Sequence, residues 1–214
     1  RDAAPRPLTA EGPWRYADMR VDGARQRLIA VREDHEAGLA EPANALVAIG
    51  FDGRVTVLAE GADFYAAPRL SPDGQRLAWL TWDHPDMPWD ACRLWLADIG
   101  HDGGLADPQC IAGGDGEAAF QPEWSPDGAL HFVSDPEGWW NLYRWDGRKA
   151  EPVFPMRAEF GLPQWVFGMT TYGFDAAGGI VAAHAVGGRW RLGRIDRASG
   201  SLSEIATPYC DFGS

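Results

Sequence analysis

The sequence predicts an all-β protein, a partial β-propeller of about four blades, each a sheet of three to four antiparallel strands. Three observations support this fold: a turn motif that recurs, a leucine-led strand that recurs at a similar interval, and a high content of turn-forming residues. Glycine and proline number 26 and 16 among 214 residues, well above their usual combined share of about 12%. No window places apolar residues at helical spacing over the length of a helix, which excludes a helical repeat.

The clearest repeat is the tetrad Ser-Pro-Asp-Gly, which begins at Ser71 and again at Ser125, 54 positions later. Proline fixes φ, aspartate can accept a hydrogen bond from the backbone two residues on, and glycine adopts φ > 0. The tetrad therefore predicts a tight turn between two antiparallel strands. Weaker copies lie at residues 21–23 and 174–178, so the chain contains four related turns.

A short strand rich in aromatic and branched residues follows each turn, and a strand led by leucine follows that one. The leading leucines recur at intervals of 48, 48 and 50 positions: Leu46, Leu94, Leu142 and Leu192. A further extended piece follows each, at 54–58, 108–111, 151–154 and 201–205. This content and period are typical of a propeller blade. We expect one propeller fragment over residues 1–214, with blades at about 14–60, 64–113, 118–156 and 164–207.

Four blades are at the low end of the range that closes into a ring. The chain begins at Arg1 rather than at methionine, and we expect a fragment of a longer ring. The end blades of such a fragment present open edges or apolar faces, which favour association with a second copy of the chain.

Composition excludes several classes of function. The net charge of −12 repels phosphate backbones and anionic lipids, so we expect no nucleic-acid partner. The longest aliphatic run, Ala45–Ile49, is far too short to cross a membrane, so we expect no membrane partner. Residues 1–10 show no apolar stretch typical of a signal peptide, and the three cysteines suit reduced thiols, so we expect a cytoplasmic protein.

The sequence also lacks the common catalytic and cofactor motifs. No G-x-S-x-G nucleophile elbow, H-E-x-x-H zinc motif or glycine-rich phosphate loop is present. The five histidines occur in unrelated local contexts. We therefore expect no metal and no cofactor, and we expect the chain alone to hydrolyse nothing.

The most unusual segment is a long loop at residues 82–90, which joins two strands of one blade where a few residues would suffice. Its side chains Asp83, His84, Trp89 and Asp90 could bind a cation or a peptide amine. The favoured alternative is a loop folded over the blade edge, with the aspartates accepting hydrogen bonds from backbone amides. Direct contact with a ligand is the second interpretation.

Two further segments carry candidate binding residues. Adjacent tryptophans, Trp139 and Trp140, occupy the corresponding loop of the next blade, and neighbours in an extended chain point to different sides. We expect one in the core, and the other could stack on a substrate or on an adjoining domain. The following link between blades carries Arg157 and Glu159, which could bind a peptide terminus or form an interdomain ion pair. The alternative is a solvated or structural ion pair.

Three segments together, at residues 82–90, 138–145 and 159–165, resemble the β-propeller domain of bacterial prolyl oligopeptidase (S9) family serine peptidases. The similarity is to the branch of acylaminoacyl peptidases and dipeptidyl aminopeptidases. The Ser-Pro-Asp-Gly tetrads alone are shared with TolB-like and WD40-like propellers. The resemblance implies a propeller of seven or eight blades that covers an α/β-hydrolase domain with a Ser-Asp-His triad, which is absent from this chain.

In that family the propeller admits short peptides and excludes folded proteins, and propeller glutamates of dipeptidyl peptidases hold the substrate amine. Glu159 is the nearest candidate for that role, although the sequence lacks an adjacent pair of glutamates. The leading hypothesis is thus a non-catalytic gating domain whose partners are its own hydrolase domain and short peptides.

Two alternatives remain open at this point. One is a stand-alone TolB-like or WD40-like propeller that binds a protein partner through its loops. The other is a hydrolase with its site in the central channel, built on carboxylates such as Asp83, Glu123 and Glu159. A stand-alone propeller should share a closing strand between its two ends, whereas a fragment should not.

Overall fold

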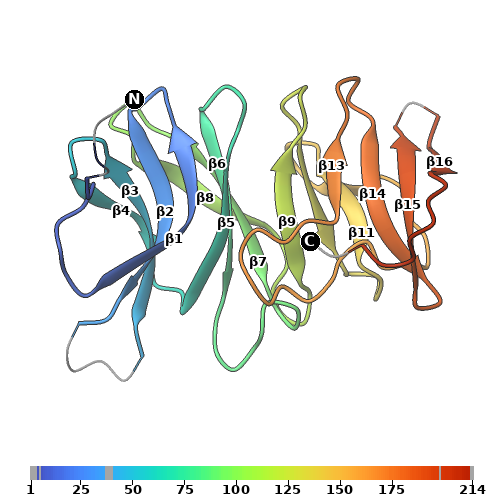
Figure 1. Ribbon diagram of the computed structural model, residues 1–214, viewed down its shortest axis with the longest axis horizontal. Helices are drawn as coiled ribbons and strands as arrows, with labels where there is room; N and C mark the ends of the chain where they lie inside the picture. The colour runs from blue at the N-terminus through green and yellow to red at the C-terminus, as the bar shows by residue number, and fades with distance from the viewer. Residues whose placement is uncertain (1–3, 5, 37–40, 198, 213–214) are drawn as a thin grey trace.

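The computed structural model describes residues 4, 6–36, 41–197 and 199–212, and its strands form four separate antiparallel sheets (Figure 1). The first sheet contains β1 (Trp14–Asp22), β2 (Arg27–Asp34), β3 (Ala43–Gly50) and β4 (Val55–Glu60). The second contains β5 (Phe64–Leu70), β6 (Arg76–Trp82), β7 (Arg93–Ile99) and β8 (Leu105–Ala112). The third contains β9 (Ala119–Trp124), β10 (Leu130–Ser134), β11 (Asn141–Trp145) and β12 (Ala150–Pro152). The fourth contains β13 (Tyr172–Phe174), β14 (Ile180–Val186), β15 (Arg189–Asp196) and β16 (Ser201–Glu204).

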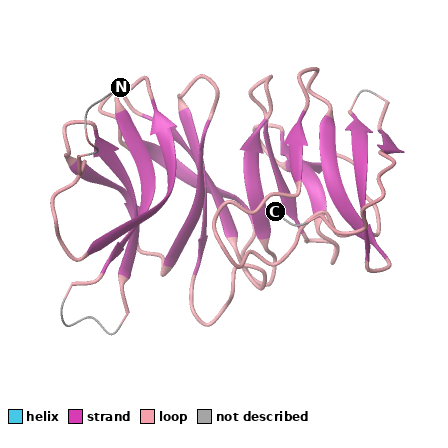
Figure 2. Cartoon of the chain, viewed as in Figure 1, coloured by secondary structure: helices cyan, strands magenta, loops and turns pink. Residues whose placement is uncertain are grey.

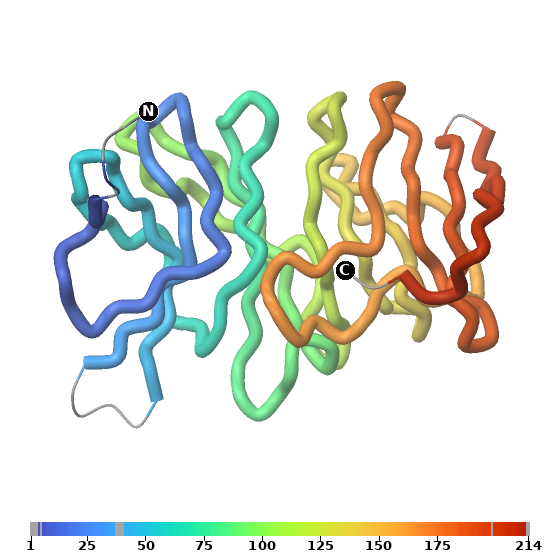
Figure 3. The backbone as a smooth tube through the Cα atoms, in the orientation of Figure 1, coloured from blue at the N-terminus to red at the C-terminus, as the bar shows by residue number. Residues whose placement is uncertain are grey.

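Each sheet pairs its four strands in sequence order, which is the topology of a propeller blade. The sheets stand in a row, with the first and fourth at opposite ends of the molecule (Figures 1 and 3). Figure 2 shows strands and loops and no helix in the described part of the chain. Within that part, no strand from one end joins the sheet at the other end. The predicted all-β partial propeller of four blades is confirmed.

The fourth strand of the third blade is shorter than the extended piece expected at 151–154. It ends at Pro152, although the Val153 amide still donates to the Leu142 carbonyl at 2.8 Å. Val153 and Phe154 instead pack against the apolar cluster between the third and fourth blades. Partial burial of these two side chains favours this course of the chain after β12.

The Ser-Pro-Asp-Gly tetrads form the turns between the first and second strands of the second and third blades. In the first tetrad, the Gly74 amide donates to the Ser71 carbonyl at 2.8 Å, and Gly74 has φ +67°. Ser71 Oγ donates to Asp73 Oδ1 and accepts from the Arg76 amide at 2.9 Å. The hydroxyl and carboxylate thus replace the ladder hydrogen bonds that the strands lose at the turn. Ser125 makes the same contacts in the second tetrad.

The core consists of apolar layers between neighbouring blades and of one further cluster within the first blade, around Val47. Residues from the first and second blades form one cluster, around Tyr65 and Trp79. A second cluster joins the second and third blades around Leu94 and Phe132. A third joins the third and fourth blades around Phe160. Each sheet therefore buries side chains on a face turned toward its neighbour, as blade packing requires.

The first strands of the blades, β1, β5, β9 and β13, follow one another across the molecule (Figure 1), and β5 contacts both β1 and β9. We call them the inner strands. Three of them contain a residue at positive φ, namely Asp18, Ala67 and Gln121 with φ between 46° and 50°. In β5 and β9 a proline, Pro68 or Pro122, comes directly after that residue, as is typical of edge strands with bulges.

Candidate functional site

The predicted site residues lie at one end of the sheets, which we call the loop face. Because strands alternate in direction, the Ser-Pro-Asp-Gly turns lie at one end and the loops between second and third strands lie at the other. The loop face carries the β6–β7 loop (83–92), the β10–β11 loop (135–140) and the link from β12 to β13 (153–171) (Figure 1). These segments hold, in that order, Asp83, His84, Trp89 and Asp90; Trp139 and Trp140; and Arg157 and Glu159.

Glu159 is fixed at both its backbone and its side chain. Its amide and carbonyl exchange hydrogen bonds of 3.0 and 2.8 Å with Ala185 at the end of β14. Its carboxylate Oε2 accepts a hydrogen bond of 3.1 Å from the Trp140 amide, and the side chain is half-buried. The described residues give Oε1 no hydrogen bond. A carboxylate held in this way can accept a charge-assisted hydrogen bond from an ammonium group.

The two adjacent tryptophans of the β10–β11 loop differ in burial. Trp140 is half-buried and tilted against Phe120, with ring centroids 5.8 Å apart, and its Nε1 donates to Asp135 at 3.1 Å. It packs against the clusters on both sides of the third blade. Trp139 is 38% exposed. One indole thus contributes to the core, and the other is available at the loop face.

The link from β12 to β13 leaves and rejoins the inner edge of the fourth blade. Glu159 pairs with β14 at Ala185, and pairing resumes when the Ala183 amide donates to the Thr171 carbonyl at 2.8 Å. The intervening segment, 160–170, loops away from the sheet (Figure 3). The inner strand of this blade is therefore split, and its upstream piece holds Glu159.

The excursion at 160–170 reaches the loop of the second blade. The ring centroids of Trp165 and Trp89 lie 4.3 Å apart, and the two ring planes meet at an angle of 52°. Trp165 is 70% exposed, and Val166 and Phe167 after it are also exposed. Met87 adds a further exposed apolar side chain on the second blade's loop. An aromatic contact thus connects the second and fourth blades across the third.

The polar residues of the β6–β7 loop mostly bind backbone and neighbouring side chains. Asp83 accepts from the Asp63 amide at 2.9 Å and pairs with Arg93 at 3.0 Å. Asp63 in turn accepts from the His84 amide at 2.9 Å, and Asp90 accepts from the Met87 amide at 3.1 Å. Hydrogen bonds of this kind, from backbone amides to aspartates, are the ones expected for a loop folded over the blade edge.

Arg157 is exposed, and no ion pair joins it to Glu159 among the described residues. The carboxylates considered for a hydrolytic channel site also have separate partners: Asp83 binds Arg93, Glu123 binds Arg69, and Glu159 binds a backbone amide. No common water or metal position follows from these contacts.

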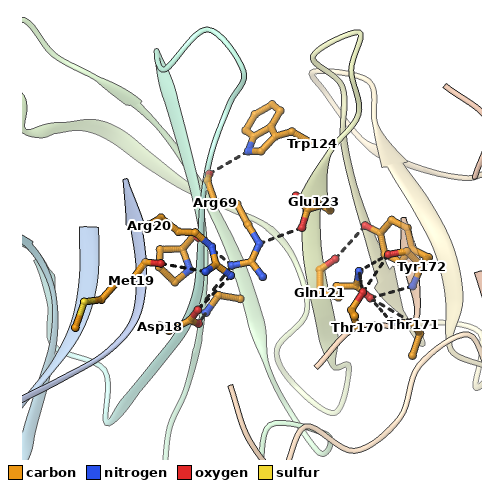
Figure 4. A network of polar contacts seen from close by, with 12 residues as sticks. Asp18, Met19, Arg20, Arg69, Gln121, Glu123, Trp124, Thr170, Thr171 and Tyr172 are labelled. Carbon is orange, nitrogen blue, oxygen red and sulfur yellow. Dashed lines mark hydrogen bonds and ion pairs between the residues drawn. The ribbon is translucent and has the colours of Figure 1, made fainter. Parts of the chain in front are cut away.

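A second polar group lies on the inner strands, and sequence reasoning missed most of it (Figure 4). The buried Asp18 carboxylate accepts from the Ala67 amide at 2.6 Å. It lies 3.4 Å from the Arg20 guanidinium and 3.9 Å from that of Arg69. Arg69 also pairs with Glu123 at 3.1 Å. These four charged residues come from three blades, and no local sequence signal connects them.

Arg20 and Arg69 border an open hollow of about 420 Å³, together with Val21, Leu70 and Glu123. Burial, and then repulsion from the Arg69 guanidinium, lower the pKa of Arg20. The side chain of Arg20 is nevertheless 37% exposed. We call this feature the inner hollow.

Solved structures similar to this chain include two proteins that hydrolyse puromycin. The crystal structure of puromycin hydrolase has a TM-score of 0.87 and 36% sequence identity, over 97% of this chain and 34% of the hydrolase. A puromycin-hydrolyzing peptidase from Mycobacterium tuberculosis has a TM-score of 0.88 and 34% identity, over 98% of this chain and 34% of the peptidase. The chain therefore spans about a third of the length of these two relatives.

A weaker likeness extends to other propellers. TolB from Acinetobacter baumannii has a TM-score of 0.53 and 17% identity over 84% of this chain and 40% of its own, which shows the fold alone. No family model matches the sequence, and no curated protein matches it either. None of the described residues forms a helix long and apolar enough to cross a membrane.

The chain, whose sheets form propeller blades, is thus similar to a segment of larger peptidases. The resemblance of the chain to the propeller domain of prolyl oligopeptidase (S9) family serine peptidases, indicated by its loop and link motifs, is confirmed.

Proposed function

We propose that the chain is the substrate-gating part of a serine peptidase that cleaves short oligopeptides, and that Glu159 binds the free amine of the substrate. The observation that carries the proposal is the match to puromycin-hydrolysing peptidases at 34–36% identity over nearly the whole chain. The catalytic α/β-hydrolase domain and its triad belong to the proposed complete enzyme, and this chain supplies selection rather than bond cleavage.

The geometry of Glu159 supports the amine-binding role. Its backbone is fixed by β14 and its Oε2 by the Trp140 amide, so the carboxylate needs little reorganisation to receive an ammonium. Trp139 is exposed in the loop that supplies this amide, and an exposed indole face can contact an apolar substrate side chain.

The alternative of a stand-alone TolB-like binding propeller has weaker support. TolB matches at 17% identity, about half that of the peptidases, and with a lower TM-score. A protein-binding role would be favoured if the coding sequence lacked a downstream G-x-S-x-G followed by Asp and His.

Substitution of Glu159 tests the amine-binding role in the complete enzyme. Glu159→Gln removes the negative charge but keeps an oxygen for the Trp140 amide. We expect KM for free-amine tripeptides to rise at least about tenfold, the size of a lost charge-assisted contact. KM for the same peptides with an acetylated amine should stay unchanged. Glu151→Gln, at an exposed position of β12, is the matched control, and equal effects of Glu159→Gln on both substrates would contradict the role.

The gating role requires that the loop face limits substrate size. Trp89 and Trp165 join the loop of the second blade to the link into the fourth. Replacing both by alanine should increase cleavage of a long unfolded polypeptide, such as reduced casein, relative to cleavage of a tripeptide. Phe51→Ala, which removes an exposed aromatic ring from the turn between β3 and β4, outside the loop face, should leave the ratio unchanged. An unchanged ratio in the double variant would count against the gate.

A further inference from the structure

Arg20 belongs to a charge-balanced group of two guanidinium groups and two carboxylates, in which its own ion pair is a long one. Asp18 is the carboxylate nearest to it, and its Oδ2 is already occupied by the Ala67 amide. The remaining oxygen, Oδ1, lies 3.4 Å from Arg20 and 3.9 Å from Arg69, so two guanidinium groups share it. Arg69 has a second carboxylate at Glu123, only 3.1 Å away. Of the two guanidinium groups, Arg20 therefore has the longer contact with its nearest paired carboxylate, 3.4 Å against 3.1 Å.

The donors of Arg20 are also incompletely used. Nη1 donates to the Met19 carbonyl at 3.0 Å, and Nη2 makes the long contact with Asp18. A guanidinium has five N–H donors in a planar fork that matches the two oxygens of a carboxylate. With 37% of its side chain exposed beside the inner hollow, Arg20 can present donors to a ligand.

The rest of the inner hollow suits a peptide better than a simple anion. Glu123 borders the hollow with its side chain 38% exposed. Its carboxylate would repel an isolated anion but can accept a hydrogen bond from an amide N–H. Val21 and Leu70 supply apolar surface between the charged groups. A donor fork, an acceptor and an apolar wall complement the carboxylate, amide and side chain of one peptide residue.

We propose that the inner hollow binds a carboxylate of a peptide, held by Arg20 and oriented by Glu123. This inference rests on the proposed function, because that function places peptides inside the arc of blades. It extends the function by adding a preference for peptides that carry a carboxylate. The carboxylate could be the C-terminus of the peptide or an acidic side chain, since both present the same two oxygens.

Peptide binding to this chain tests the inference directly. The probes are Ala-Ala-Ala with a free C-terminus, its C-terminal amide, and Ala-Glu-Ala amide, titrated by isothermal titration calorimetry. We expect the free acid to bind at least about tenfold more tightly than the amide. Tighter binding of Ala-Glu-Ala amide than of Ala-Ala-Ala amide would identify a side-chain carboxylate as a second source.

Variants at Arg20 show whether the effect belongs to the inner hollow. Arg20→Gln should remove the difference between acid and amide, and Arg20→Lys should restore only part of it because lysine lacks the planar fork. Arg15→Gln is the matched control: Arg15 is exposed on the same strand, and its Nη1 also donates to the carbonyl of the preceding residue at 3.0 Å. This variant should bind like the unmodified chain.

Two results would overturn the inference: equal or absent binding of acid and amide, or a preference for the acid that survives in Arg20→Gln. Failure here is distinguishable from failure of the proposed function. The amine-binding role of Glu159 is read from free-amine against acetylated peptides, and that comparison does not involve the carboxyl end.

Discussion

His131 is an ionisable side chain enclosed by the third and fourth blades. It is fully buried in β10, and its Nδ1 lies 3.2 Å from the Ala129 carbonyl oxygen. Its ring and the Phe174 ring are arranged edge to face, with their centroids 5.0 Å apart. Burial lowers the pKa of His131 from 6.5 to about 4. No hydrogen bond to Nε2 occurs in the described residues. The folded state therefore holds the neutral imidazole, and protonation must be coupled to unfolding.

This burial predicts a loss of stability in mild acid. Because the folded pKa lies below the unfolded value, the contribution of neutral His131 is complete above pH 6.5 and declines as the pH falls toward 4. We expect the free energy of unfolding, measured with urea, to fall by about 2 kcal/mol between pH 7.5 and 5 from this residue. His131→Gln should remove that part of the decline, while His101→Gln, at an exposed turn, should not. An unchanged pH dependence in His131→Gln would contradict the assignment.

At the residue scale, the sequence predicted contacts that are local and missed contacts that are remote. The hydrogen bond of 3.0 Å from the Gln75 amide to Asp73 follows from the tetrad, because aspartate in such a turn accepts from the backbone two residues on. The ring contact of Trp89 with Trp165 depends on a whole intervening blade. Both tryptophans belong to motifs that the sequence singled out, but their pairing depends on tertiary packing that no local pattern encodes.

At the element scale, the link between the third and fourth blades depends on one glycine. Phe160 donates its amide to the Trp140 carbonyl at 2.6 Å, which brings the next residue, Gly161, against the indole. A Cβ atom at Gly161 would lie 1.6 Å from Cε3 of Trp140. Any larger residue must therefore displace Trp140, whose amide holds Glu159 and whose Nε1 binds Asp135.

Gly161→Ala should consequently destabilise the chain by about 3 kcal/mol, a typical cost of forcing an extra carbon into a packed site. Urea denaturation monitored by tryptophan fluorescence measures this. Gly173→Ala is the matched control, because Gly173 lies in β13 with nothing within 4 Å of its would-be Cβ. That variant should be nearly neutral. Similar costs for the two substitutions would mean that the link tolerates movement of Trp140.

The sequence predicted most elements but not the split inner strand of the fourth blade. The turns and the leucine-led strands are regular in composition, and their periodicity was sufficient to predict the blades. Glu159 makes a single isolated bridge, and the residues after it leave the sheet at once. No run of residues with a strand pattern therefore marks this position in the sequence. Its pairing with Ala185 is therefore visible only in three dimensions.

At the scale of the whole molecule, two pairs of blades are joined by the same device on the inner strands. Asp18 in the first blade accepts from the Ala67 amide of the second. Gln121 in the third accepts from the Thr171 amide of the fourth at 2.7 Å, and also donates to the Tyr172 carbonyl at 2.7 Å. Asp18, Ala67 and Gln121 lie where the pairing of their strands shifts register. In each pair, a polar side chain at positive φ satisfies a backbone donor of the next blade.

The second and third blades are joined differently because the corresponding side chain, at Ala67, is a methyl group. Here Arg69 binds Glu123, and the Trp124 indole donates to the Arg69 carbonyl at 3.0 Å. Arg76 donates to the Gly128 carbonyl at 3.1 Å and lies over the Trp124 ring, 4.6 Å from its centroid. Long side chains thus replace the short inner contact at this junction.

The inner contact between the first two blades can be tested at Asp18. Asp18→Ala leaves the Ala67 amide without its acceptor, removes the charge between Arg20 and Arg69, and places alanine at φ 48°, where asparagine and aspartate are better tolerated. We expect the free energy of unfolding to fall by about 3 kcal/mol. Asp18→Asn keeps the acceptor and the backbone preference, so it should cost about half as much. Asp86→Ala, at an exposed position in the β6–β7 loop, is the control. Equal losses for alanine and asparagine would mean that the charge of Asp18, rather than its hydrogen bond to the second blade, stabilises the junction.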